Sequence, residues 1–252
     1  YDTGYTPGNK QYLVMEKIHG YTLARLLDGG RKLGEKQACA LMAQLCEALT
    51  GLHNLGMTHC DLKPRNIMMD RRNKRARLID FGLVRDSQGL IRLLEQEHMI
   101  AGRQEFAEDI DAGMLVGTPE FVAPEQISDA RLEDAALTRT DTTADVFSLG
   151  VIFYLMLTGD VPWPFVPKSE KPKPYRKELL RYMAKRIKSE GLKLTRPDHV
   201  SEPLWSIVQK ALRNEPKMRQ GDAQALHLDV QRYLDMGAGI PADLDEEHTI
   251  LV

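Results

Sequence analysis

Apolar residues recur at helical spacing in several parts of the chain. Between Glu35 and Leu55 the apolar positions lie three or four residues apart, and Gly56 follows them as a helix-stopping residue. This set comprises Ala38, Leu41, Met42, Leu45, Leu49 and Leu52. The same spacing predicts four later helices, over Asp145–Leu157, Arg176–Lys188, Glu202–Leu212 and Asp222–Leu234. A short helix is also predicted after the capping residue Thr22, ending at Gly29-Gly30.

Strand patterns are confined to two places. Near the start, a strand, a Pro-Gly-Asn turn and a second strand over Gln11–Lys17 predict a hairpin that the chain enters partway. Later, two short strands over Ile67–Met69 and Arg77–Ile79 flank the polar turn DRRNKRA. A small β region followed by a helix-rich body indicates the α+β class.

Composition narrows the class of protein. The 252 residues suit one large domain or two small ones, and 42% hydrophobic with 28% charged residues is typical of globular proteins. A net charge of −2 gives no electrostatic reason to expect nucleic acid or a membrane surface as partner. The longest apolar run, around Val151–Leu157, is too short to span a bilayer, and no signal peptide opens the chain. The three cysteines, Cys39, Cys46 and Cys60, have no metal-ligand spacing and indicate a reducing compartment, so we expect a cytoplasmic protein.

Candidate chemistry is concentrated in the segment HCDLKPRN, residues 59–66. Asp61, Lys63 and Asn66 supply a carboxylate, a cation and an amide oxygen within six positions, and Asp80 adds a carboxylate at the end of a predicted strand. Asn66 and Asp80, together with substrate phosphates, have the oxygen ligands that Mg²⁺ prefers. Asp61 is suited to take a proton from an attacking hydroxyl, and Lys63 to neutralise charge on the transferred group. Each motif alone is weak evidence, because a single loop Asp is more often a cap or turn residue.

Further motifs follow along the chain, and together they make the evidence much stronger. They are Asp80-Phe81-Gly82, Gly117-Thr118-Pro119, Ala123-Pro124-Glu125, Asp145–Gly150, and Asn214-Glu215-Pro216 with Arg219. In this order, with HCDLKPRN before them, they resemble the protein kinase family, specifically the C-terminal lobe of bacterial-type serine/threonine kinases. The resemblance covers Gln11–Leu234. It implies a protein-kinase-like fold, mainly the helical C-terminal lobe with a remnant β-hairpin of the N-terminal lobe.

The resemblance implies transfer of the γ-phosphoryl group of ATP to Ser or Thr hydroxyls of a protein substrate, with Mg²⁺ as cofactor. By the same match, Asp61 is the catalytic base and Lys63 the cation that faces the phosphate. Asn66 and Asp80 match the two Mg²⁺ ligands. Thr118 matches the loop residue that hydrogen-bonds the catalytic Asp and Lys.

The resemblance also implies a division of the chain and two supporting contacts. Residues 1–17 match partial N-terminal-lobe strands and the start of the hinge, residues 18–236 the C-terminal lobe with catalytic loop 57–66 and activation segment 80–125, and residues 237–252 an acidic flexible tail. Glu125 and Arg219 match a buried ion pair that holds the substrate-facing loop. Asp145 matches an acid that braces the catalytic-loop backbone.

The stretch YLVMEKIHG resembles the last strand of the N-terminal lobe and the hinge. By that match Met15 is the gatekeeper, and the backbones of Glu16 and Ile18 contact adenine. The 252 residues contain no G-x-G-x-x-G loop and no V-A-I-K lysine before this hinge, the elements that cover the ATP phosphates. Three explanations stay open: a fragment of a longer kinase, an N-terminal lobe supplied by another chain, or a kinase-fold binding module that acts as a scaffold. The intact catalytic and metal-ligand set favours the enzyme.

Cys60 is a departure from the family pattern. The family has an Arg at this position that meets a phosphate on the activation segment, a charge-assisted bond that Cys cannot supply. Ser87 is the only hydroxyl side chain within residues 83–117, so we expect control by another route, with a redox-sensing thiol at Cys60 as an alternative. The stretch GLIRLLEQEHMI within the same residues predicts an amphipathic helix, unless it is a solvated insertion.

Overall fold

A computed structural model describes residues 2–6, 8, 11–80, 85–86, 120–129, 141–163, 178, 182 and 194–237 of the chain. The first half contains strands β1 (Asp2–Tyr5), β2 (Gln11–Val14) and β3 (Gly20–Thr22), helix α1 (Leu23–Leu26), 3-10 helix η1 (Asp28–Gly30), helix α2 (Glu35–Asn54), strand β4 (Met57–Thr58), 3-10 helix η2 (Pro64–Asn66), and strands β5 (Ile67–Asp70), β6 (Arg75–Leu78) and β7 (Arg85–Asp86). The second half contains helices α5 (Pro124–Asp129), α6 (Thr142–Thr158) and α8 (Glu202–Ala211), 3-10 helix η3 (Pro216–Met218) and helix α9 (Ala223–Gly237).

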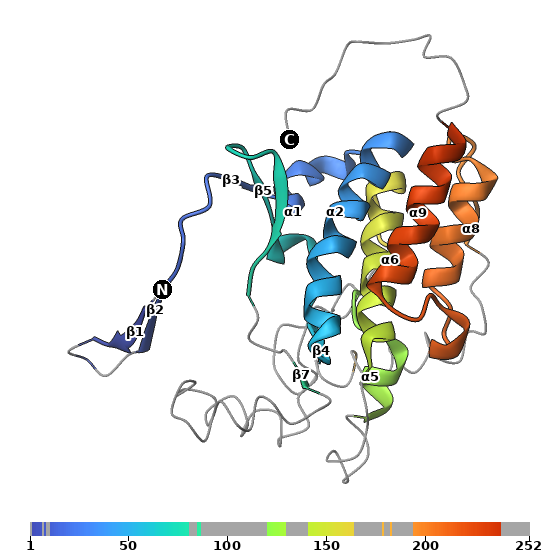
Figure 1. Ribbon diagram of the computed structural model, residues 1–252. Helices are drawn as coiled ribbons and strands as arrows, with labels where there is room; N and C mark the ends of the chain where they lie inside the picture. Colours follow the sequence, from blue (N-terminus) through green and yellow to red (C-terminus); the bar gives the residue numbers. More distant parts are fainter. Residues whose placement is uncertain are drawn as a thin grey trace.

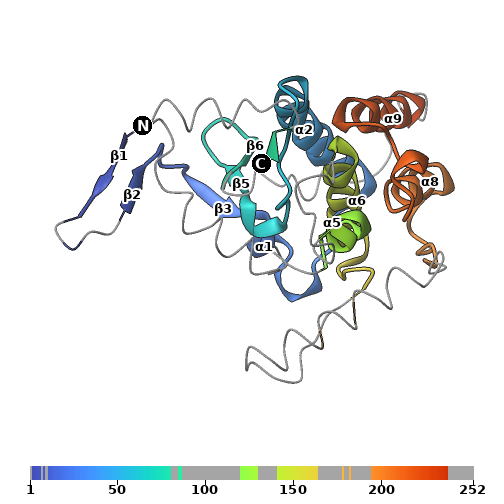
Figure 2. The same cartoon turned by 90° about the horizontal axis from the view of Figure 1, so that it is seen from below.

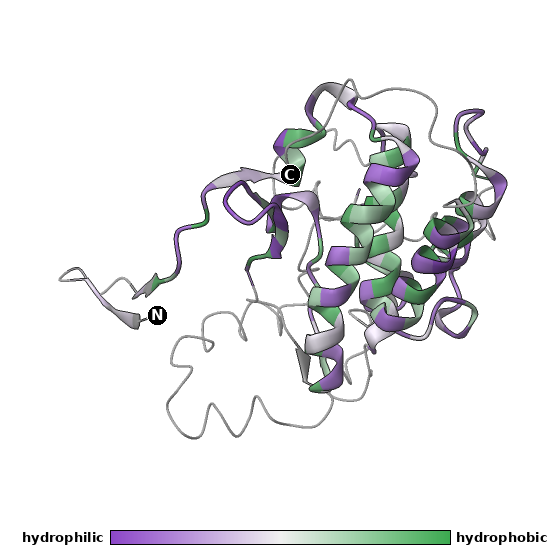
Figure 3. Ribbon diagram, turned by 45° about the horizontal axis from the view of Figure 1, so that its top comes forward, coloured by the Kyte–Doolittle hydropathy of each residue, from purple (hydrophilic) through white to green (hydrophobic). Residues whose placement is uncertain are grey.

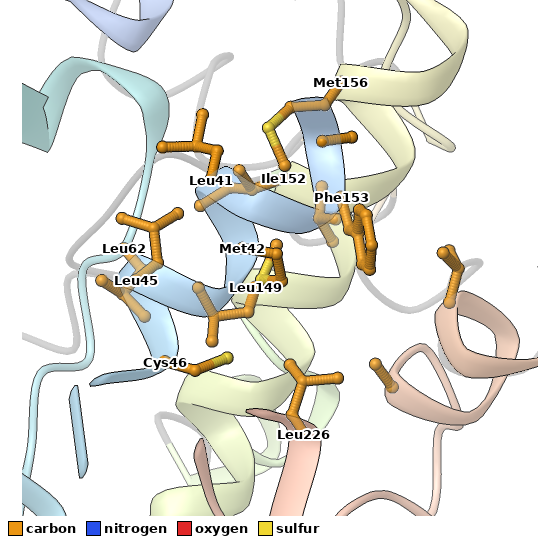
Figure 4. Packing of buried hydrophobic residues seen from close by; sticks show 14 of the residues in the cluster. Leu41, Met42, Leu45, Cys46, Leu62, Leu149, Ile152, Phe153, Met156 and Leu226 are labelled. Carbon is orange, nitrogen blue, oxygen red and sulfur yellow. The ribbon is translucent and has the colours of Figure 1, made fainter. Parts of the chain in front are cut away.

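The four long helices pack around one apolar core. α2 contacts both α6 and α9, and α8 also contacts α6 and α9. Figure 4 shows the centre of this core, where Met42 and Leu45 of α2 meet Leu149 and Ile152 of α6, with Leu226 of α9 beside them. All five side chains are fully buried, and burial of a side chain of this size contributes roughly 1.5–3 kcal/mol. In Figure 3, the helices other than the central one carry both hydrophobic and hydrophilic positions, as an amphipathic pattern requires.

Helix α6 is the central helix of this core. It is buried around nearly its whole circumference, so its apolar residues do not form a single stripe. Asp141 caps its first turn by accepting a hydrogen bond from the backbone N–H of Thr143 at 2.9 Å. Gly159 ends it with φ 81°, in the left-handed region that favours glycine. Close packing requires Gly150, because an added Cβ would lie 2.9 Å from the Cβ of Ala211 on α8.

Helices α2 and α9 run antiparallel and are joined at both ends. The backbone N–H of Ala223, at the start of α9, donates to Nδ1 of His53 at the end of α2, at 3.3 Å. At the other end, the hydroxyl of Tyr233 donates to the Glu35 carboxylate at 2.6 Å. Burial, together with the Glu35 carboxylate, raises the pKa of Tyr233 to about 12.

The strands in the described residues form three small antiparallel sheets, β1–β2, β3–β5–β6 and β4–β7. In the first hairpin Asp2 lies opposite Val14 and Tyr5 opposite Gln11. Figures 1 and 2 show this hairpin set apart from the helices and joined to them by an extended segment. Its large exposed apolar residues are Tyr5, Tyr12 and Val14, followed by Met15. The β3–β5–β6 sheet lies against the helices, with β6 in contact with α2.

The cysteines are placed as small apolar residues. Cys39 and Cys46, both on α2, are fully buried in the core, and Cys60 is also buried. None of the three forms a disulfide. Burial raises the pKa of Cys39 to about 12 and also raises that of Cys46. Cys39 and Cys46 are therefore part of the apolar core.

The α+β class and the helix predictions for residues 35–55, 202–212 and 222–234 are confirmed to within a few residues. Thr22 caps α1 as predicted, accepting from the backbone N–H of Arg25 at 3.2 Å. Helix α6 starts three residues earlier than predicted, because Asp141 and not a residue near Asp145 caps it. Strand β2 ends at Val14 and not Lys17, because its partner strand β1 begins opposite Val14.

Two further strand boundaries differ from prediction, and some predicted segments cannot be compared. The strands predicted over Ile67–Met69 and Arg77–Ile79 are β5, which ends one residue later, and β6, which covers Arg75–Leu78. The predicted helix over residues 176–188, the amphipathic stretch within 83–117 and the predicted tail over residues 237–252 lie almost entirely outside the described residues. No helix in the described ranges is both long and apolar enough to cross a membrane.

Candidate active site

The backbone of the predicted catalytic loop is held by a buried acid on the central helix. Asp145, fully buried in the first turn of α6, accepts from the backbone N–H of His59 at 2.8 Å and from that of Cys60 at 2.9 Å. Cys60 has φ 66°, a left-handed conformation that costs a residue other than glycine roughly 1–3 kcal/mol. Two hydrogen bonds to one carboxylate offset that cost and fix the direction in which the next residue leaves the turn.

That next residue is Asp61, and the structure brings the predicted cation and amide to its carboxylate. Lys63 Nζ lies 2.7 Å from Asp61 Oδ2, and Asn66 Nδ2 donates to the same oxygen at 3.0 Å. Asn66 Nδ2 also donates to the backbone carbonyl of Asp61 at 3.0 Å. Asp61 and Asn66 are both buried, with 9% and 5% of their surface exposed. Within the described part of the chain, both side-chain bonds go to Oδ2, which leaves Oδ1 to interact with a substrate.

A backbone hydrogen bond of the preceding residue brings Asp80 to this cluster. The N–H of Ile79 donates to the carbonyl of Asn66 at 2.9 Å, so the end of the strand pair leads Asp80 to the catalytic loop. Asp80 is exposed and has φ 65°. Because the amide nitrogen of Asn66 is used by Asp61, its oxygen is the atom suited to ligate a cation beside the Asp80 carboxylate. No group of three or more His, Cys, Asp or Glu in the described residues could hold a metal alone, so Mg²⁺ here would also need phosphate oxygens.

His59 is a fully buried imidazole under this cluster. Its Nδ1 accepts from the backbone N–H of Asp61 at 3.4 Å, which places the proton of the neutral ring on Nε2. Burial lowers the pKa of His59, and the carboxylates of Asp145, Asp61 and Asp80 oppose that shift. The ring therefore supports the loop as a neutral group.

Residues 15–19, within the stretch YLVMEKIHG predicted to contain the hinge, form an extended segment between β2 and β3. Glu16 accepts a bond from an Arg77 guanidinium nitrogen at 2.8 Å, and Arg77 Nε lies 3.2 Å from the buried carboxylate of Asp70. Met15 is 58% exposed and Ile18 is half-buried. The hinge leads into β3, which pairs with β5 and contacts η2, the turn that carries Asn66. The predicted adenine end and phosphate end of the site are therefore connected through one small sheet.

Arg219 forms the predicted ion pair with Glu125 below the site. Its two terminal nitrogens donate to the two carboxylate oxygens of Glu125 at 2.6 and 2.8 Å. The remaining N–H groups donate to the backbone carbonyls of Arg213, Thr143 and Asn214, at 2.7, 2.9 and 2.8 Å. All five guanidinium donors thus have an acceptor, which is the condition for burying this charge.

Comparison with known proteins decides the family. The protein kinase domain model matches residues 2–230. The chain belongs to the protein kinase family. It is 35% identical to the serine/threonine-protein kinase Pkn1 of Myxococcus xanthus over 65% of this chain and 20% of that protein. It is 29% identical to the serine/threonine-protein kinase PknB of Mycobacterium tuberculosis (92% of this chain, 32% of that protein) and to sperm motility kinase 3A of Mus musculus (96% and 39%). The chain thus spans between a fifth and two fifths of the length of these curated relatives.

Some residues of the predicted site lie outside the described residues, and others were missed from the sequence. Thr118 and the Phe81-Gly82 pair are outside the described residues. His53 was not singled out, although its Nε2 lies 3.0 Å from Asp145 Oδ2 and so helps to orient the acid that braces the loop. Its partner is 92 positions away, so no local pattern indicates the contact.

Gln126 was also missed. Its side-chain oxygen accepts from the backbone N–H of Ala123 at 2.9 Å, and its nitrogen donates to the carbonyl of Cys60 at 3.3 Å. A signal for the first bond was present, because Ala-Pro-Glu-Gln has proline at the first helical position and glutamine at the third.

Proposed function

We propose that this chain carries the catalytic centre of a serine/threonine protein kinase, which transfers the γ-phosphoryl group of ATP to a Ser or Thr hydroxyl of a protein substrate. The strongest support is the contact of Lys63 and Asn66 with the Asp61 carboxylate. Asp145 holds the backbone just before Asp61. A binding module that acts only as a scaffold has no need of such an arrangement, so the cluster favours the enzyme.

Asp61 is the proposed base. Lys63 and Asn66 occupy Oδ2, so Oδ1 would orient the attacking hydroxyl and accept its proton. Lys63 Nζ, 2.7 Å from the same carboxylate, would be within reach of the phosphoryl group that meets this hydroxyl, and would stabilise its charge. Thr118 is proposed to complete the cluster by hydrogen bonding to Asp61 and Lys63.

Asn66 and Asp80 are the proposed ligands of Mg²⁺. Their oxygens fit a hard cation that keeps several of its ligands as water or phosphate. When bound, the ion would supply positive charge to the phosphate oxygens. The bond between the Ile79 N–H and the Asn66 carbonyl would keep the two ligands in register, because it fixes the end of one strand to the turn that carries Asn66.

ATP is proposed to bind with its adenine at the hinge. There the backbones of Glu16 and Ile18 would contact the base and Met15 would act as gatekeeper. The bond from Arg77 to the Glu16 side chain supports this, because it fixes the hinge without using the backbone groups that adenine needs. We expect the remaining N-terminal-lobe elements to come from the same longer chain or from a second chain.

The test uses protein with a complete N-terminal lobe, either in one chain or reconstituted from two. Transfer of radiolabel from ATP to a basic protein substrate should depend on Mg²⁺ and yield phosphoserine and phosphothreonine. Asp61→Asn should reduce turnover at least about a hundredfold and leave ATP affinity within about twofold, because the base acts on the hydroxyl and not on the nucleotide. Nucleotide binding by the unaltered protein without any transfer would contradict the kinase function and support the scaffold.

A further inference from the structure

Gln126 is a buried polar residue that the proposed chemistry does not use. It lies in the first turn of α5, directly after Glu125, and is 9% exposed. Its Oε1 accepts from the backbone N–H of Ala123 at 2.9 Å, while its Nε2 donates to the backbone carbonyl of Cys60 at 3.3 Å. One side chain therefore joins the start of α5 to the catalytic loop.

The first of these bonds is a helix cap. Since α5 starts at Pro124, Ala123 is the capping position and Gln126 the third helical residue. A Glu or Gln at that place reaches back to the N–H of the capping residue. For this bond alone a carboxylate would be at least as good, because it also interacts favourably with the helix dipole. The second bond distinguishes glutamine from glutamate at this position. Only the amide carries a donor for the Cys60 carbonyl as well as an acceptor for the N–H of Ala123.

The second bond falls on the backbone just before the proposed base. Cys60 has φ 66°, and its N–H is held by Asp145 Oδ1 at 2.9 Å. Its carbonyl is held by Gln126, so the residue is fixed from α6 on one side and from α5 on the other. The carbonyl belongs to the peptide unit that leads into Asp61, so the bond constrains the direction in which that side chain leaves the loop.

We propose that Gln126 is a positioning residue that couples the substrate-facing segment at residues 120–126 to the backbone of Asp61. The inference rests on the proposed kinase function. Glu125 ties the same helical turn to Arg219, and Phe121 is held by a bond from Ser148 Oγ to its carbonyl at 2.7 Å. The segment is thus anchored to the lower helices, and Gln126 transmits its position to the catalytic loop.

Two substitutions separate the cap from the coupling. Gln126→Glu keeps the acceptor for Ala123 but sets a carboxylate against the Cys60 carbonyl oxygen. It should lower kcat about five- to tenfold, the effect of one hydrogen bond, with the KM for ATP nearly unchanged. The melting temperature should also fall, because a buried carboxylate then faces a carbonyl oxygen. Gln126→Met removes both bonds and should lower kcat similarly while also lowering the melting temperature by about 2–4 °C.

The chain contains a matched control for the cap. Gln37 occupies the third position of α2, and its Oε1 accepts from the N–H of the capping residue Gly34 at 3.3 Å. It lies at the opposite end of α2 from His53, which contacts the brace Asp145. Gln37→Glu should therefore leave the melting temperature nearly unchanged, Gln37→Met should lower it by about 2–4 °C, and both should leave kcat unchanged.

The experiment measures kcat, the KM for ATP and for a peptide, the melting temperature, and hydrogen exchange of the amides in residues 57–66. Gln126→Glu should show faster exchange in this loop together with reduced kcat, and the Gln37 variants neither. Wild-type kcat in Gln126→Glu, or unchanged exchange in the loop, would overturn the inference. No transfer by the unaltered protein would instead refute the kinase function, and the exchange comparison, which needs no turnover, would still decide whether Gln126 holds the loop.

Discussion

Truncation of Glu125 should destabilise the protein more than truncation of any exposed acid in an ion pair. The Glu125 carboxylate neutralises a guanidinium whose side chain is fully buried, through two bonds of 2.6 and 2.8 Å. Glu125→Ala would leave that charge in place with only the three backbone carbonyls as acceptors. Removal of one partner of a buried pair costs about 3–5 kcal/mol. For a chain of this size, that loss lowers the melting temperature by roughly 6–20 °C.

Arg75 and Glu47 provide the comparison for this prediction. They form an ion pair at 3.4 Å, but their side chains are 65% and 55% exposed. Glu47→Ala should therefore cost less than about 1 kcal/mol, and the cost should shrink further at high salt. Thermal unfolding followed by circular dichroism, at low and high salt, gives both values. Equal shifts in melting temperature for the two variants, or a large effect of salt on Glu125→Ala alone, would contradict this reasoning. Either result would show that the burial of Arg219 does not determine how much stability is lost when its acid partner is removed.

Three further outcomes are expected from the site. Asp80→Asn should weaken Mg²⁺-dependent nucleotide binding by about tenfold or more in calorimetry, because it removes the only charged ligand proposed for the ion; an unchanged affinity would place the ion elsewhere. Because Cys60 offers no charge to a phosphate, phosphatase treatment of the active protein should leave its activity within about twofold, and a large drop would contradict that view. Burial lowers the pKa of His59 below 6.5, so the unfolded chain binds a proton that the folded chain does not, and stability should fall as the pH drops below about 6.5. Urea unfolding at several pH values gives the free energy of unfolding as a function of pH. This free energy should depend less steeply on pH in His59→Asn, and an identical dependence would rule out His59 as the source of the pH effect.

Sequence reasoning predicted best what depends on near neighbours. Helix α2 was predicted closely because its buried residues, from Ala38 to Leu49, repeat along one face. The cluster of Asp61, Lys63 and Asn66 could be predicted because all three lie within six positions and the 3-10 turn brings them together. Strands β3 and β4 were missed because three and two residues are too few to show an alternation.

Contacts across long separations could not be predicted from local patterns. The bond from Gln126 to Cys60 joins residues 66 positions apart, and that from His53 to Asp145 joins residues 92 positions apart. The start of α6 was misplaced for a local reason: its first turn begins with Thr142 and Thr143, which add nothing to the apolar spacing, and Asp141 caps it. Asp145 braces the loop backbone, as the family resemblance implies.

The buried polar residues of this lobe share one arrangement, and it explains why the core tolerates them. A buried polar group is costly unless it is hydrogen-bonded, so a core of this kind would be more stable with apolar side chains at most positions. Asp145, His53 and Gln126 are all buried or half-buried, and each belongs to a network that ends on the backbone of residues 59–60. Apolar replacements could fill the same space, but they could not hold a loop at φ 66°. The polar groups therefore specify the direction of the residue that follows, and the surrounding helices supply the stability that this requires.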